Sequence, residues 1–447
     1  MCVAVYYVPS TVSGSLPGLP RRRAQAYSHR AVRAGDRSVT GSIYPMELVT
    51  VDHVLAAQKV LRGVVRQTPV ESSRVLADWH GGEVYLKCEN LQRTGSFKLR
   101  GAYTRIHGLT AQERARGVVA ASAGNHAQGV ALAASLLDTE ATVFMPERVP
   151  LPKLDATRGY GADVHLTGEV FDDTLAAAVE FAERTGAVFI HPFDHPDVIA
   201  GQGTLGLEVL DQVPTAGTVL VAAGGGGLVG GVAAAVRGLR PEVRVVGVQA
   251  EQAAALPPSL AAGEPVRLPQ VHTMADGIAV GQPGAGTFRH VAELVDEVVT
   301  VTEGSLSRAV LLCMERAKQV VEPAGAAAVA ALLQHPGRFP SPVVAVLSGG
   351  NVDPILLLKI IRHGMTAAGR YLALRLRIPD RPGSLAGLLS LLGERGVNVL
   401  DVEHTRISGA LELGEAEVGL NLETRGIGHC AELVSVLRNA GYTVLAS

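Results

Sequence analysis

One lysine of the chain, Lys98, stands between the bulky apolar residues Phe97 and Leu99 in the segment SFKLRGA. Apolar neighbours on both sides predict a poorly hydrated amine, and poor hydration lowers the pKa of a lysine because it disfavours the charged form. A neutral amine can act as a nucleophile or as a base. The alternative is an ordinary helix lysine whose charge reaches solvent, so the interpretation depends on what accompanies Lys98.

Three loops could form a site around this lysine. The loop SAGNHAQG, residues 122–129, ends a strand and begins a helix, where free backbone N–H groups can hold a carboxylate; a plain Ser or Asn helix cap is the alternative. The loop GGGGLVGG, residues 224–231, is rich in glycine, so its backbone can approach a phosphate closely. The loop LSGGNVD, residues 347–353, follows a third apolar run.

The glycine-rich loop is also compatible with a different cofactor. Gly225, Gly227 and Gly230 form a GxGxxG pattern, and Glu251 lies about 20 residues further on, as in nicotinamide-dinucleotide sites. A dehydrogenase gives no role to Lys98 or to the loop at 122–129. The nicotinamide interpretation therefore rests on the glycine pattern alone.

Composition excludes several classes of protein. The chain has 447 residues, of which 47% are hydrophobic and 18% charged, so it can bury a large core over about two or three domains. A net charge of -2 gives no basic surface for nucleic acid, and the apolar runs are too short to cross a membrane. The scattered cysteines form no CxxC pair, which argues against disulfides and zinc and favours the cytoplasm; they are Cys2, Cys88, Cys313 and Cys430.

The first 45 residues differ from the rest. They contain three consecutive arginines from Arg21, several prolines and serines, and no acidic residue before Asp36. An apolar segment of the kind found in signal peptides is missing. We expect residues 1–45 to be a disordered arm or to precede the true start at Met46, and the Arg-rich character also permits a transit peptide.

From Val51 onward, short Val-rich runs alternate with Ala-rich helical stretches. This alternation predicts an α/β fold of open parallel sheets with helices on both faces, and ligands at the carboxyl ends of the strands. The clearest helix is expected at residues 126–137. The expected strands are 118–122, 141–145, 218–223, 243–250 and 343–347.

The pattern changes after residue 369. Residues 370–447 read as strand, helix, two strands, helix and strand, which predicts a separate α+β unit. We therefore expect a catalytic domain at 46–369, made of two α/β subdomains, and a smaller domain at 370–447.

The motifs together resemble the fold type II (tryptophan synthase beta-like) pyridoxal-phosphate enzymes, and most closely the threonine ammonia-lyases, or threonine dehydratases. The shared segments occur in the family's order across residues 46–369. They are SFKLRGA, SAGNHAQGVA, QGTLGLEVL, GGGGL, VEPAGAAA and SGGN.

The resemblance implies that pyridoxal 5'-phosphate is the cofactor and that Lys98 binds its aldehyde covalently. It further implies that the glycine loop holds the phosphate through backbone N–H groups, that Asn125 contacts the ring hydroxyl, and that Ser348 faces the pyridine nitrogen. The implied cofactor contacts are Lys98, Phe97, Asn125, Gly224, Gly225, Gly226, Gly227, Leu228 and Ser348.

The substrate residues also follow from the resemblance. The substrate carboxylate is expected at Ser122, Ala123, Gly124, Asn125 and His126. His126 could instead be a structural histidine. Glu322 matches a family position beside the cofactor, but a carboxylate that stabilises a helix N-terminus is an equal alternative.

The implied reaction is β-elimination of water from L-threonine, giving 2-oxobutanoate and ammonia, with L-serine giving pyruvate. Lys98 would remove the Cα proton, and a neutral serine at Ser348 gives a weaker electron sink than an aspartate, which suits elimination. Serine racemase, a related enzyme, has a second proton donor where this chain has Ala123. Elimination rather than racemisation is therefore expected.

A site for a divalent metal ion is not expected. Serine racemase binds a divalent cation at positions that align with Gln249, Ala253 and Ala255, and neutral side chains are poor ligands for Mg²⁺. Glu251 could compensate only if the alignment shifts. A monovalent cation stays open.

The C-terminal unit, with DRPGSL at residues 380–385, resembles an ACT domain, a regulatory module that binds amino acids at dimer interfaces. The resemblance places effector contacts at Asn398 and Gly383 and implies a homo-oligomer, a dimer or a tetramer. An oligomerisation module without a ligand, or an amino-acid sensor without catalysis, is the alternative. The effector's identity, and the choice between isoleucine biosynthesis and threonine catabolism, stay open.

Overall fold

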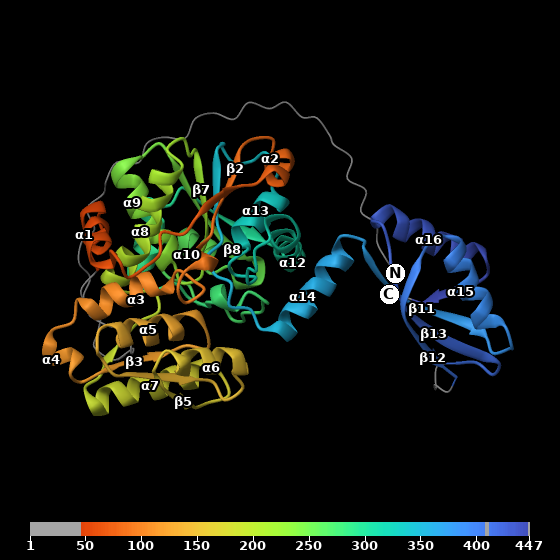
Figure 1. Cartoon of the computed structure of the whole chain (residues 1–447), viewed down its shortest axis with the longest axis horizontal. Helices are drawn as coiled ribbons and strands as arrows, with labels where there is room; N and C mark the ends of the chain where they lie inside the picture. Colours follow the sequence, from red (N-terminus) through yellow and green to blue (C-terminus); the bar gives the residue numbers. More distant parts are fainter. Residues whose placement is uncertain (1–45, 407–410, 446–447) are drawn as a thin grey trace.

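The computed structural model describes residues 46–406 and 411–445, so the predicted N-terminal arm lies outside the described residues. The described chain forms three sheets, two of them within the catalytic part and one in the C-terminal unit (Figure 1). This arrangement agrees with the predicted fold class. No helix among the described residues is long and apolar enough to span a bilayer.

The larger sheet has six strands in the order β1-β2-β10-β7-β8-β9, and only β1 runs antiparallel to its neighbour. Its central strands are almost continuously apolar because helices cover both faces. Val219 and Val221 of β7 pack toward one face, and Leu220 and Ala222 toward the other. The strands are β1 (Val70–Ser72), β2 (Val84–Lys87), β7 (Thr218–Ala222), β8 (Arg244–Ala250), β9 (Glu297–Val301) and β10 (Val343–Val346).

Helices α8 and α9 contribute to the core on one face of this sheet, and α12 and α13 to the core on the other. Helix α12 ends in a π-helical turn, Cys313–Ala317. The helices of this subdomain are α1 (Val51–Leu61), α2 (Arg74–His80), α8 (Pro196–Gln212), α9 (Gly227–Leu239), α10 (Leu256–Ala262), α11 (Ala285–Leu294), α12 (Glu303–Leu312), α13 (Ala327–Gln334) and α14 (Pro354–Ala367), with 3₁₀ turns at Glu89–Leu91, Glu251–Ala253 and Asp276–Ile278.

The smaller sheet is fully parallel, in the order β5-β4-β3-β6. Helices α3, α5 and α6 share a core with one face, and α7 covers the other (Figure 1). The elements are α3 (Lys98–His107), α4 (Ala111–Arg114), β3 (Val118–Ala121), α5 (Asn125–Leu136), β4 (Ala141–Met145), α6 (Leu151–Gly159), β5 (Asp163–Leu166), α7 (Phe171–Thr185) and β6 (Val188–Phe189).

Helix α3 joins the two subdomains because it packs closely on α8. A Cβ atom at Gly201 would lie 2.6 Å from the Arg100 carbonyl oxygen and 2.7 Å from the Cα of Gly101. Glycine at this crossing lets the two helix backbones approach. The Gln202 side chain adds a hydrogen bond, because its Oε1 accepts from the Gly101 N–H at 3.3 Å.

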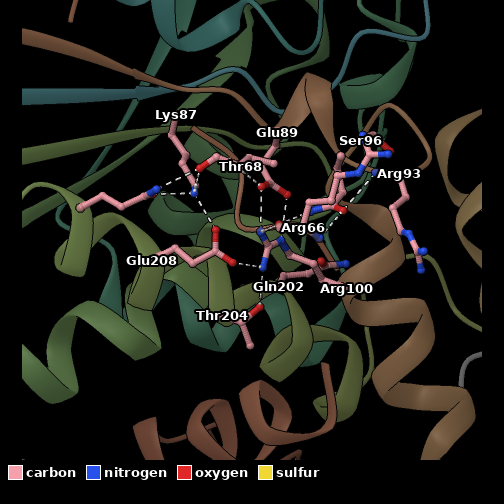
Figure 2. A network of polar contacts seen from close by, with 12 residues as sticks. Arg66, Thr68, Lys87, Glu89, Arg93, Ser96, Arg100, Gln202, Thr204 and Glu208 are labelled. Carbon is pink, nitrogen blue, oxygen red and sulfur yellow. Dashed lines mark hydrogen bonds and ion pairs between the residues drawn. The ribbon is translucent and has the colours of Figure 1, made fainter. Parts of the chain in front are cut away.

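A buried ionic network holds the same helix from the side of the large sheet (Figure 2). Arg100 of α3 donates two hydrogen bonds of 2.8 Å to the Glu89 carboxylate and one of 2.7 Å to Glu208 of α8. Lys87 of β2 donates to the other oxygen of Glu208 at 2.6 Å. The side chains of Arg100, Glu89 and Lys87 are fully buried, and two cations face two carboxylates, so the charges balance.

The C-terminal unit has the order strand, helix, two strands, helix and strand that its sequence predicts. Its antiparallel sheet runs β12-β13-β11-β14 and has its own apolar core. Arg370, which directly precedes the first strand of this sheet, forms an ion pair with Glu315 of the π-helical turn. The elements are β11 (Tyr371–Pro379), α15 (Ser384–Glu394), β12 (Asn398–Thr405), β13 (Glu415–Glu423), α16 (Ile427–Asn439) and β14 (Thr443–Leu445).

Candidate active site

Lys98 is the first residue of α3 and lies half-buried between the two subdomains. Burial lowers its pKa to about 8, although Glu322 nearby acts in the opposite direction. Its Nζ donates a hydrogen bond of 2.8 Å to the Pro192 carbonyl and lies 5.2 Å from the centre of the Phe97 ring. A lowered pKa is what the apolar neighbours of Lys98 predict.

The glycine loop connects the end of β7 to the start of α9. Gly226 has φ +95° and precedes the first turn of α9, whose N–H groups receive no side-chain cap. A Cβ atom at Gly225 would lie 2.5 Å from the Phe193 ring, and one at Gly227 would lie 2.9 Å from the Phe193 carbonyl oxygen. The loop therefore offers a bare backbone and the start of a helix, which suit a phosphate. The Leu228 side chain packs in the core, so only its backbone can take part.

The loop at residues 122–126 connects the end of β3 to the start of α5. Gly124 precedes the helix, and no side chain caps the helix N-terminus. The Ser122 hydroxyl accepts a hydrogen bond of 3.2 Å from the Gly124 N–H, and Ala123 is half-buried. Uncapped N–H groups at a helix start can hold a carboxylate.

His126 differs from its neighbours in this loop. It is 4% exposed, and its Nε2 lies 2.8 Å from the Ile190 carbonyl, to which it donates. Burial lowers the pKa of His126 to about 3, so the ring is neutral. These contacts favour the structural alternative for His126 over direct binding of substrate.

A polar cluster lies close enough to Lys98 for Glu322 to act on the pKa of the lysine. Asn125 donates to Glu322 Oε1 at 2.5 Å and accepts from Asn351 at 2.8 Å. Burial, together with Asp276, raises the pKa of Glu322 to about 8. The Glu322 side chain thus faces Asn125 rather than the start of α13. Ser348 is buried, and its carbonyl accepts from the Phe97 N–H at 3.2 Å, next to Lys98.

These residues fit pyridoxal phosphate. A poorly hydrated amine, a glycine loop without room for Cβ atoms, an uncapped helix start and a buried polar cluster come from stretches far apart in the sequence and meet at the carboxyl ends of the strands. The amine can bind an aldehyde, and the glycine loop can bind a phosphate.

Comparison with known proteins agrees with this geometry. The family model for "Pyridoxal-phosphate dependent enzyme" matches residues 61–349, and the ACT domain model matches residues 373–423. An L-threonine ammonia-lyase of Thermotoga maritima is 47% identical over 397 residues, which is 89% of this chain and 99% of that protein. The chain belongs to the threonine ammonia-lyase family of pyridoxal-phosphate enzymes. The resemblance drawn from the motifs is thereby confirmed.

Solved structures of the pyridoxal-phosphate enzymes give the same result. The processed threonine deaminase isoform 2 of Solanum lycopersicum is 37% identical with a TM-score of 0.66, covering 72% of this chain and 98% of that one. Maize serine racemase is 35% identical with a TM-score of 0.67, covering 70% and 97%. Membership in this family leaves the nicotinamide interpretation of the GxGxxG pattern without support.

We expect Gly225→Ala to weaken binding of the family cofactor by about fivefold or more, because overpacking of a tight site costs about 1–3 kcal/mol. The new methyl group would lie 2.5 Å from the Phe193 ring and push the phosphate loop out of place. Equilibrium titration of the cofactor-free protein with pyridoxal phosphate measures the change. Gly159→Ala, where nothing lies within 4 Å, is the matched control. Equal affinities for both variants would contradict the proposed cradle.

Two features of this pyridoxal-phosphate site were missed by sequence reasoning. Lys153 of α6 forms an ion pair with Asp276 and so joins the two subdomains. Its Nζ lies 3.6 Å from the position of a Cβ added to Gly124. The second feature is the turn at residues 191–194, which supplies the carbonyl that holds Lys98. That turn follows the short strand β6. Because ligands are expected at the carboxyl ends of strands, this strand was the sequence signal that could have revealed the turn.

Gln249, one of the three positions considered for a divalent cation, carries an amide. Gln249 is buried, its Oε1 accepts from the Leu256 N–H at 2.9 Å, and its Nε2 lies 3.5 Å from the Gly224 carbonyl. Ala253 and Ala255 are buried and apolar. Within residues 46–406 and 411–445, no group of three or more His, Cys, Asp or Glu side chains could hold a metal ion.

The predicted effector residues lie in the ACT domain. Gly383 has φ +89° and precedes α15. Asn398 begins β12, and its amide donates to Glu423 at 3.2 Å.

Proposed function

We propose that the protein converts L-threonine to 2-oxobutanoate and ammonia by β-elimination of water, and L-serine to pyruvate and ammonia. The observation that carries the proposal is the position of Lys98, a lysine with a lowered pKa between a phosphate-binding glycine loop and a helix start suited to a carboxylate. Relatives named L-threonine ammonia-lyase support threonine as the substrate.

Each group of the site has a defined role. Pyridoxal phosphate, when bound, supplies an electron sink that makes the Cα proton of an amino acid acidic. The glycine loop at residues 224–227 holds its phosphate, and Ser122 with the N-terminus of α5 binds the substrate carboxylate. Lys98 would hold the cofactor aldehyde, and its free amine would accept the Cα proton.

The remaining polar groups tune the site. Ser348 carries no charge, so it leaves the pyridine nitrogen without a carboxylate partner. Asn125 hydrogen-bonds Glu322, whose raised pKa leaves it substantially protonated near neutral pH. Neutral groups around the cofactor suit elimination, because they stabilise a carbanion only weakly and so favour departure of the β-hydroxyl.

The proposal is tested with purified protein and L-threonine. Equal amounts of 2-oxobutanoate and ammonia should form without added nicotinamide cofactor, and borohydride treatment should abolish both turnover and the visible absorption of the bound cofactor. A colourless protein that binds NAD, or one that releases no ammonia from either substrate, would refute the proposal.

Racemisation is the second candidate because maize serine racemase shares the fold. A racemase needs a proton donor on the face opposite the lysine, and Ala123 has no exchangeable proton. We expect the wild-type protein to form little D-serine from L-serine, and Ala123→Ser to introduce measurable racemisation with some loss of elimination. Chiral chromatography of the serine pool measures both.

The alternative for Ala123 is that a small residue is needed for packing, in which case the serine variant would lose both activities. Ala121→Ser, two residues earlier in β3, controls for the added hydroxyl. Substantial D-serine from the wild-type protein would show that another residue supplies the second proton.

Regulation is proposed for the ACT domain, with an amino-acid effector bound near Asn398 and Gly383 and with a homo-oligomer as the working form. The open edge of β12 supports assembly, since Leu400 and Val402 of this strand are exposed.

We place the protein in the cytoplasm, because the three cysteines in the described part of the chain are free.

Truncation after Gly369 should leave turnover of threonine but remove any sigmoidal or effector response, because effector and substrate sites are then separated. The core of the ACT domain lies wholly within residues 372–444, so its removal leaves the catalytic cores intact. Saturation curves with isoleucine, valine, leucine, serine and AMP measure the response of both forms. Unchanged cooperativity in the truncated protein would overturn this assignment.

A further inference from the structure

The turn at residues 191–194 forms one wall of the Lys98 site. It follows β6 of the smaller sheet and begins with His191-Pro192. The Pro192 carbonyl accepts the hydrogen bond of 2.8 Å from Lys98 Nζ. A carbonyl oxygen can only accept, so it fixes one N–H of the amine and leaves the nitrogen lone pair directed elsewhere.

His191 holds this turn in place. Its Nδ1 accepts from the backbone N–H groups of Asp194 at 2.7 Å and of Phe193 at 3.2 Å. Burial lowers the pKa of His191 to about 4, so Nδ1 keeps its lone pair at neutral pH. The ring also meets the Phe193 ring edge-on, with 4.6 Å between the ring centres.

The same turn contacts the glycine loop at residues 224–227. The Phe193 ring fills the space beside Gly225. Asp194 Oδ1 accepts from the Thr287 N–H at 2.8 Å, and the Thr287 hydroxyl donates to the Gly225 carbonyl at 2.6 Å. A shift of this turn would therefore move the Pro192 carbonyl, which accepts the hydrogen bond from Lys98, relative to the glycine loop.

We infer that His191 is a positioning residue for Lys98: by accepting two backbone N–H groups it fixes the turn whose Pro192 carbonyl sets where the Lys98 amine stands when it takes the substrate proton. The inference rests on the proposed function. His191 itself touches neither the lysine nitrogen through a hydrogen bond nor the reacting atoms. Its contribution is to the geometry of proton removal rather than to substrate affinity.

In the described part of the chain, the titratable groups that interact with the Lys98 charge are Glu322, His126 and His191 itself. The Pro192 carbonyl adds to these by favouring the protonated amine, since an ammonium group makes the stronger hydrogen bond. Loss of that acceptor should lower the pKa of Lys98.

The test compares His191→Leu with His191→Asn in the full-length holoenzyme. Asparagine places a carbonyl oxygen where Nδ1 stands and can accept the same backbone N–H groups. The leucine variant should lose about tenfold or more in kcat for threonine, while its KM stays within about twofold of wild type. The acidic side of its pH profile of kcat should move to lower pH. The asparagine variant should stay within about threefold of wild type.

His195 provides the matched control. Its Nδ1 also accepts a backbone N–H, that of Asp197 at 3.1 Å, but at the start of α8. His195→Leu should cost some thermal stability and leave kcat and its pH profile unchanged. A similar loss of kcat in both leucine variants would show a merely structural role for His191.

His191→Asp serves if the leucine variant does not fold. Aspartate can accept the same N–H groups and adds a negative charge. This charge should shift the acidic side of the pH profile of kcat to higher pH, and it should also raise the pH midpoint of the cofactor's visible absorption. An unchanged midpoint with unchanged kcat would overturn the inference. Absence of threonine turnover in wild type, with normal cofactor absorption, would instead refute the proposed function.

Discussion

Replacing Lys98 by alanine should lower kcat for threonine by about 10⁴-fold or more, because one side chain supplies both the nucleophile and the general base. Within residues 46–406 and 411–445 no equivalent amine stands in the same place, and Lys153, which lies near the site, is paired with Asp276. The variant should also lose the visible absorption that borohydride abolishes in the wild-type protein. Steady-state kinetics and absorption spectra measure both effects.

Lys59→Ala is the control for this experiment, since Lys59 is exposed on α1 and far along the chain from the site. It should retain wild-type kcat and absorption. Turnover by Lys98→Ala within tenfold of wild type would mean that a different base removes the proton.

Arg100→Met should cause the largest loss of stability, about 3–5 kcal/mol, because removing one partner of a buried ionic network leaves the others without compensation. Glu89 would then be a fully buried carboxylate whose two hydrogen bonds from Arg100 are gone (Figure 2). Lys87 still compensates Glu208, so the penalty falls mainly on Glu89. Urea denaturation followed by the fluorescence of Trp79 and by circular dichroism measures the loss.

Arg148→Met is the matched control, because its ion pair with Glu169 is 85% and 76% exposed and exposed pairs contribute little. The double variant Arg100→Met with Glu89→Gln should recover part of the loss, since the glutamine carries no buried charge. Equal unfolding midpoints for Arg100→Met and Arg148→Met would contradict the role of the network.

Local sequence patterns predicted much of the fold. The strand at Ala141–Met145 was placed at its observed bounds, and the order of elements in residues 371–445 was correct. Both results depend on apolar periodicity and on turn residues, which are properties of neighbouring residues.

The parts that sequence did not predict depend on contacts between distant segments. Lys153 meets Asp276 across 123 positions, and Lys98 meets Pro192 across 94. Neither Lys153 nor Pro192 belongs to a segment that resembled the family. The segment QGTLGLEVL was recognised, but the partnership of Glu208 with Lys87 and Arg100 became apparent only when α8 and α3 were placed together.

The decisive measurement is the site of covalent attachment of the cofactor. The purified holoenzyme is reduced with borohydride and digested, and the peptides are identified by mass spectrometry. We expect the reduced pyridoxyl-phosphate group on Lys98 alone, at about one group per chain. Attachment to another lysine, such as Lys153, or a cofactor that dialyses away after reduction, would contradict it.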